Sequence, residues 1–172
     1  MPTKSTKPTT KPSLAKPDLH AELLRLVAAA LAAAEQSYAA AIEGATHSES
    51  KAENDKDTRA LEQSYVARGQ AMRVDELRAG LADVEKMALR AFGEDDAIAS
   101  GAVVSVEDQD DDSTHCYFVA PSGGGTTLAN GRVQVVTPKS PLGRALCGKR
   151  VGDEVELAIA GKTRSITITR VA

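Results

Sequence analysis

The sequence predicts an α+β protein in which an N-terminal antiparallel helical hairpin of coiled-coil type precedes a C-terminal antiparallel sheet domain with one short helix. Three observations support this prediction. Two stretches repeat apolar residues at alternating steps of three and four, the composition changes abruptly after Gly93, and short β-type runs fill the remainder. We therefore divide the 172 residues into a tail (1–17), a hairpin (18–92) and a globular domain (93–172).

The tail is rich in Lys, Pro, Thr and Ser and contains no acidic residue. Such a segment cannot bury enough apolar surface to offset the entropy lost on ordering, so we expect a disordered basic tail. It is either a solubilising segment or a basic arm that contacts nucleic acid. It lacks the apolar core of a secretory signal, and the run LLRLVAAALAAA is too short to span a bilayer. We therefore expect a soluble, cytoplasmic protein that does not bind membranes.

The hairpin is predicted from two apolar series with heptad-type spacing. The first helix should begin at Asp18, which can cap its free N–H groups. The first series comprises Leu24, Val27, Leu31, Ala34, Tyr38 and Ala41, and the second comprises Val74, Leu77, Leu81, Val84 and Ala88. Neither helix could bury its apolar stripe alone, so each requires the other as its partner.

A chain reversal near residues 54–57 gives arms of about 18–53 and 57–91, each roughly 50 Å long. Gly93 should stop the second helix. A competing layout, with the break at Gly44, gives arms of unequal length.

The segment SESKAENDKD, residues 48–57, carries the acidic residues Glu49, Glu53, Asp55 and Asp57 at the predicted reversal. It is either an ordinary solvated loop or an acidic tip presented to a partner. The lysines and the arginine that interleave with the acids could neutralise much of their charge, although exposed pairs of this kind add little stability.

The C-terminal domain should contain five strands, formed by AVVSV, HCYFVA, RVQVV, DEVELAIA and RSITITRV. Between the third and fourth, SPLGRALCGK predicts a short helix capped by Ser140 and stopped by Gly148. The segment DQDDDS, residues 108–113, lacks the Gly and the terminal Glu of an EF-hand loop, so we expect a hairpin turn. Cys116 and Cys147 match no metal-ligand spacing and should be free thiols, with a disulfide as the alternative.

The stretch TPKSPLGRALCGKRVGDEVEL, residues 137–157, resembles the C-terminal domain of the bacterial Gre transcription elongation factors. The matching residues stand in the family's order: Ser140, Pro141, Arg144, Ala145, Leu146, Gly148, Lys149, Gly152 and Asp153. Strand order, linker and helical arm also agree, so the resemblance extends over residues 18–172. It implies an FKBP-like C-terminal domain and an N-terminal antiparallel coiled coil.

The resemblance also implies a function. The globular domain would dock at the rim of the RNA polymerase secondary channel, and the coiled coil would reach the active site. The docking residues would be Ser140, Pro141, Leu142, Arg144, Leu146, Gly148 and Lys149. In this family, acidic tip residues help to hold a second Mg²⁺, so that the polymerase cleaves its own backtracked RNA. The chain would then be no enzyme by itself, would have no cofactor of its own, would act on the RNA 3′ end indirectly, and would be a monomer.

The tip departs from the family pattern Gly-Asp-x-x-Glu-Asn followed closely by Glu-Tyr. Alignment of Glu53 and Asn54 with the family's Glu-Asn places Ser50 at the Asp position and Asp57 at the Tyr position. We adopt this alignment because it keeps carboxylates at the tip. It makes Glu53, Asp55 and Asp57 the predicted tip residues, and Glu53 and Asp55 would share the Mg²⁺ with the polymerase.

Alignment on Tyr65 instead places Thr58 and Leu61 at the two acidic positions, with no carboxylate at either. Because neither alignment preserves the Asp/Glu pair, the alternative function is a secondary-channel regulator or inhibitor that does not stimulate cleavage. Prolyl isomerase activity is suggested only by the FKBP-like fold. It needs an aromatic pocket, and the domain contains only Tyr117 and Phe118 as aromatic residues.

Overall fold

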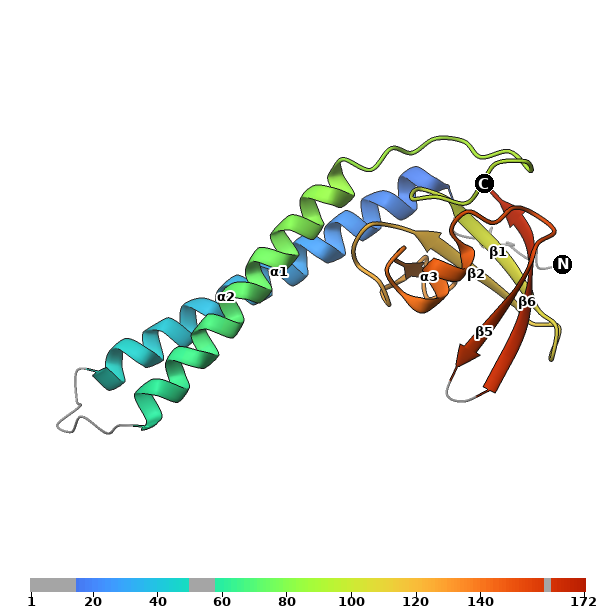
Figure 1. The fold of residues 1–172 in the computed structure, drawn as a ribbon. Helices are drawn as coiled ribbons and strands as arrows, with labels where there is room; N and C mark the ends of the chain where they lie inside the picture. Colours follow the sequence, from blue (N-terminus) through green and yellow to red (C-terminus); the bar gives the residue numbers. More distant parts are fainter. Residues whose placement is uncertain (1–14, 50–57, 160–161) are drawn as a thin grey trace, which may run out of the picture.

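The computed structural model describes residues 15–49, 58–159 and 162–172 (Figure 1). A hairpin of two long helices projects from a domain that contains a six-stranded sheet and one short helix. The elements in chain order are α1 (Lys16–Glu49), α2 (Thr58–Glu85), β1 (Val103–Asp108), β2 (Thr114–Val119), β3 (Thr127–Leu128), β4 (Val133–Val136), α3 (Pro141–Leu146), β5 (Glu154–Ile159) and β6 (Lys162–Val171). This arrangement confirms the predicted fold class.

The two helices of the hairpin lie side by side and run in opposite directions (Figure 1). Between residues 28 and 44, the positions of α1 that are not exposed are Leu31, Ala34, Tyr38 and Ala41, which are the predicted apolar positions. The α1 helix continues through Gly44, so the layout with a break there is wrong. No helix in the described part of the chain combines the length and apolar character needed to cross a membrane.

The start of α1 differs slightly from the prediction. The helix begins at Lys16, and the Ala15 carbonyl accepts hydrogen bonds from the amides of Asp18 (3.0 Å) and Leu19 (3.1 Å). Pro17 is compatible with this position because N–H groups in the first turn of a helix have no acceptor within the helix. Asp18 therefore lies within the first turn, where its charge favours the positive end of the helix dipole.

The end of α2 contradicts the prediction, since the helix stops at Glu85 and does not continue to Gly93. The His20 side chain of α1 donates from Nε2 to the Val84 carbonyl oxygen at 2.8 Å, and the Met87 amide donates to the same oxygen at 3.2 Å, so this carbonyl at the helix end is satisfied without a further turn of helix. Ala88 lies beyond the helix and is exposed, so its assignment to the apolar seam is wrong.

The chain leaves the helix because Phe92 belongs to the core of the sheet domain, where it is buried. Two cations cover its ring: Lys16 Nζ lies 4.5 Å and Arg90 Cζ 3.9 Å from the ring centroid. The amide of Gly93 donates to Asp96 at 2.8 Å, and together with Arg90 it holds the pKa of that carboxyl below its usual range. These contacts fasten the linker to the base of the hairpin.

The sheet has the strand order β3-β4-β2-β1-β6-β5. The pair β2–β4 is parallel and the other four pairs are antiparallel, so the predicted antiparallel sheet is in fact mixed. The segment between β2 and β4 is long enough to return the chain to the start of a parallel strand. It contains β3, a two-residue strand that the sequence analysis missed because so short a run shows no alternation.

Apolar clusters cover both faces of the sheet. On one face, Leu19, Leu23 and Val27 of α1 pack with Val84 of α2 against Phe118 and its neighbours. On the same side, the Ala129 amide donates to Glu22 Oε2 at 2.9 Å. The base of the hairpin is thus part of the core of the sheet domain.

The other face carries the second cluster, which includes Ile98, Val104, Val106, Val119, Ile168 and Leu146 of α3. The short helix α3 packs on this side, next to β5. Six residues of helix do not extend over the whole of this face, and the uncovered part forms a groove.

Candidate functional site

The helix α3 is held in place by its N-terminal cap. The Ser140 hydroxyl accepts a hydrogen bond from the Gly143 amide at 3.0 Å and donates to the Thr137 carbonyl oxygen at 2.8 Å. Pro141 occupies the first turn, where its fixed φ suits the helix. The predicted cap at Ser140 is confirmed, and it fixes α3 to the end of β4.

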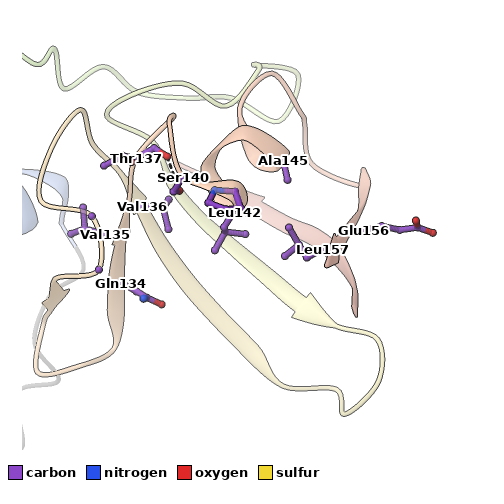
Figure 2. Close-up of a pocket in the computed structure, with 12 residues that line it drawn as sticks. Gln134, Val135, Val136, Thr137, Ser140, Leu142, Ala145, Glu156 and Leu157 are labelled. Atoms are coloured by element: carbon purple, nitrogen blue, oxygen red, sulfur yellow. Dashed lines mark hydrogen bonds between the residues drawn. The ribbon is translucent and has the colours of Figure 1, made fainter. Parts of the chain in front are cut away.

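A groove of about 600 Å³ lies between α3, β4 and β5. Figure 2 shows Leu142 of α3 and Leu157 of β5 directed toward this shared space, whereas the Glu156 carboxylate points away from it. The complete lining is Gly124, Gly125, Gln134, Val135, Val136, Thr137, Ser140, Pro141, Leu142, Ala145, Glu156 and Leu157. The lining is mainly apolar and a single acid stands at the edge, which suits an apolar anchor flanked by a cation.

The structure separates the predicted docking residues into two groups. Pro141, Arg144 and Lys149 are exposed, and Leu142 is half-buried in the groove wall. These four side chains can contact a partner.

The other three serve the fold. Leu146 is fully buried in the core, so its prediction as a docking residue is wrong. Ser140 uses its hydroxyl within the cap of α3. Gly148 has φ +83°, a left-handed conformation that glycine adopts without strain, and its amide donates to the Ile98 carbonyl at 2.9 Å.

Sequence reasoning missed Gln134, Thr137, Glu156 and Leu157 as groove residues. The alternation in DEVELAIA marks Glu156 and Leu157 as residues of opposite faces, but not which groove they would border. The one sequence feature that indicates a groove is the short length of the predicted helix, because a single six-residue helix leaves part of the sheet uncovered.

The exposed charges around the groove are divided between its two walls. Arg144 lies in α3, Lys149 follows α3, and Glu156 lies in β5.

Cys147 follows α3 and is a free thiol, whose pKa is raised by burial. The thiol is therefore neutral and poorly nucleophilic at neutral pH.

The predicted acidic tip residues Glu53, Asp55 and Asp57 lie outside the described residues. Across residues 15–49, 58–159 and 162–172, no group of three or more His, Cys, Asp or Glu side chains could hold a metal ion. The segment DQDDDS joins β1 to β2 as predicted, and within it Asp108 accepts from the Asp110 amide at 2.9 Å and from Arg164 at 3.1 Å.

With the domain and its groove defined, comparison with known proteins shows what the C-terminal domain is similar to. The family described as "Transcription elongation factor, GreA/GreB, C-term" matches residues 93–172, the segment that holds all six strands and α3. The match covers the C-terminal sheet domain and does not include the helical hairpin.

Two curated proteins similar to this chain are both named transcription elongation factor GreA. The protein of Rhodospirillum rubrum is 33% identical over 94 residues, which is 55% of this chain and 54% of the relative. The protein of Zymomonas mobilis is 31% identical over 105 residues, which is 58% of this chain and 63% of the relative. This chain thus covers less than two thirds of the length of either relative.

Solved structures with similarity to this chain include GreA factor homolog 1 (Gfh1) of Thermus thermophilus, at 19% identity and a TM-score of 0.39 over 87% of this chain and 94% of that one. A GreA/GreB elongation factor of Nitrosomonas europaea matches at 22% identity and a TM-score of 0.39, over 58% of this chain and 78% of that one.

Proposed function

We propose that this chain is a transcription elongation factor that binds RNA polymerase, inserts its hairpin into the secondary channel and stimulates cleavage of backtracked RNA. One observation carries the proposal: a GreA/GreB C-terminal domain has the base of a long helical hairpin built into its core. At about 1.5 Å per residue, the 34 residues of α1 extend roughly 50 Å. A docked domain would therefore hold the far end of the hairpin at a fixed place deep inside its partner.

The junction between hairpin and domain supports this role because it is a packed and hydrogen-bonded contact. Leu19 and Leu23 of α1 are almost completely buried against the sheet. The Glu22 carboxylate accepts a hydrogen bond from the Ala129 amide. A flexible tether would let the tip sample a large volume, whereas this junction restricts it.

The acidic segment beyond α1 would supply the chemistry. Glu53 and Asp55 provide carboxylate oxygens, which are the ligands that Mg²⁺ prefers. These residues would share a Mg²⁺ with the polymerase, where the ion would stabilise charge during phosphodiester hydrolysis. The protein itself would contribute position and ligands, and the reaction would remain that of the polymerase.

A second function, a channel regulator that does not stimulate cleavage, is favoured by one feature of the sequence. Ser50 stands where the family pattern has Asp. Prolyl isomerase activity has no such support, since none of the described residues lining the groove is aromatic.

Docking is tested by the variant Leu142→Gln, which places an amide in the apolar wall of the groove. We expect its affinity for RNA polymerase from the same organism to fall about tenfold, as truncation of a central interface contact does. The dissociation constant should be measured by fluorescence with labelled protein, and the melting temperature of each variant should be recorded alongside it.

Leu89→Gln is the matched control, because Leu89 is 37% exposed and does not line the groove. Its affinity should stay within about twofold of the unmodified protein. If Leu142→Gln binds as tightly as Leu89→Gln, the groove is not the docking surface. If the unmodified chain does not bind polymerase at all, the proposed function is wrong.

A further inference from the structure

The distal half of α2 exposes large apolar side chains on its surface. Leu61 is 55% exposed, Tyr65 65% and Met72 59%, whereas the seam residues Val74 and Val84 are buried. Apolar residues therefore occupy two sides of this helix. Packing against α1 accounts for only one of them.

These exposed residues share one face. At 100° per residue, Leu61, Tyr65, Arg68 and Met72 fall within an arc of about 60°, centred opposite the side that α2 turns to α1. We call these four residues the outer stripe. It runs along the part of the hairpin farthest from the sheet domain (Figure 1).

The outer stripe carries one charged side chain, Arg68. In the described part of the chain, Arg68 forms no ion pair or hydrogen bond. Two neighbouring arginines of α2 do form ion pairs: Arg73 with Glu76 at 3.6 Å and Arg78 with Glu35 at 2.9 Å. The outer stripe thus presents an apolar surface with one cation in its middle, which is complementary to an apolar surface that carries a carboxylate.

The size of the outer stripe argues against a stable dimer of this chain. Three side chains that are each more than half exposed present on the order of 300 Å² of apolar area, whereas a standard interface needs about 800 Å² per partner. A patch of this size suits an additional contact with a partner that is already held elsewhere.

We propose that the outer stripe is a second protein-binding surface, which packs against an apolar, acid-bearing part of the channel wall of the polymerase. This inference rests on the proposed function, because the groove of the C-terminal domain would supply the first contact. The outer stripe would then fix the rotation of the hairpin about its long axis.

The test is the triple variant Leu61→Gln, Tyr65→Gln, Met72→Gln, compared with Ala32→Gln, Ala39→Gln, Ala40→Gln, which places three glutamines on exposed positions of α1. The first variant should bind polymerase about tenfold more weakly, with a melting temperature close to that of the unmodified chain. The second should bind normally. Arg68→Glu alone should also weaken binding, because it would oppose like charges.

A photoreactive group at position 65 identifies the contact directly. In the docked complex, Tyr65→p-benzoylphenylalanine should crosslink to a protein subunit of the polymerase. A crosslink to RNA or to a second copy of this chain would overturn the inference.

The affinities separate the two failures. Equal affinity of the two triple variants, with the unmodified chain still bound, would overturn the inference and leave the proposed function standing. Absence of binding by the unmodified chain would overturn both.

Discussion

Substitution of Gly143 by alanine should destabilise the protein by about 3 kcal/mol or more. A Cβ atom at this position would lie 1.8 Å from the Thr137 carbonyl oxygen and 2.6 Å from its carbonyl carbon. Both are backbone atoms at the end of β4, so the clash cannot be relieved by rotation of a side chain. The helix α3 would have to move away from the sheet, which would expose Leu146 and break the Ser140 cap.

The measurement is thermal unfolding followed by circular dichroism, where a loss of this size should lower the melting temperature by about 10 °C. Gly69→Ala is the control, because a Cβ atom there meets no other atom within 4 Å. That variant should be slightly more stable, by about 0.5–1 kcal/mol, since alanine favours a helix interior over glycine. Equal melting temperatures for the two variants would show that α3 does not lie as close to β4 as described.

Leu23→Ala should cost about 3–4 kcal/mol in the free energy of unfolding. Leu23 is 0% exposed and lies in the cluster that joins the hairpin to the sheet domain. Its surroundings are closely packed, since Phe118 lies in the same cluster and a Cβ atom on Gly123 would lie only 2.7 Å from Leu23 Cδ1. The resulting cavity should loosen the junction as well as the fold.

The control for Leu23→Ala is Leu61→Ala, the same change at a leucine that is 55% exposed. Chemical denaturation should show a change within about 0.5 kcal/mol for this variant. Hydrogen exchange at the amides of α1 near Leu23 should accelerate in Leu23→Ala and not in Leu61→Ala. A similar cost for both variants would contradict the packed junction.

Local patterns in the sequence predicted the features that depend on neighbouring residues. The apolar seam of the hairpin was predicted from periodicity, and Leu31, Ala34, Tyr38 and Ala41 of α1 are half-buried while the positions between them are exposed. The cap of α3 was predicted because it depends on one turn of the chain. Ser140 forms a hydrogen bond with the Gly143 amide, and Pro141 occupies the first turn of the helix. Such features need no knowledge of the distant chain.

Features that depend on distant contacts could not be predicted in the same way. The apolar spacing of α2 continues to Ala88, but the helix stops at Glu85, where His20 bonds to the Val84 carbonyl and Phe92 is drawn into the sheet domain. The resemblance to Gre factors assigned a docking role to Leu146, whereas packing of α3 on the sheet buries this side chain.

The groove illustrates the same limit for the site. Its walls come from β4, α3 and β5, and three other strands separate β4 from β5 in the sheet, so local patterns could not show that Gln134 and Leu157 line one cavity. The outer stripe, in contrast, was partly visible in the sequence, because Leu61, Tyr65 and Met72 fall outside the seam spacing. That these side chains are exposed follows only from the structure, which gives the exposed fraction of each residue along α2.

The most direct test of the proposed function is transcript cleavage by backtracked elongation complexes of the organism's own RNA polymerase in the presence of Mg²⁺. We expect the unmodified chain to shorten the RNA from its 3′ end. The variant Glu53→Ala, Asp55→Ala, Asp57→Ala should lose this stimulation and still bind the polymerase. Binding of the unmodified chain without any shortening of the RNA would contradict the proposal and identify the protein as a secondary-channel regulator.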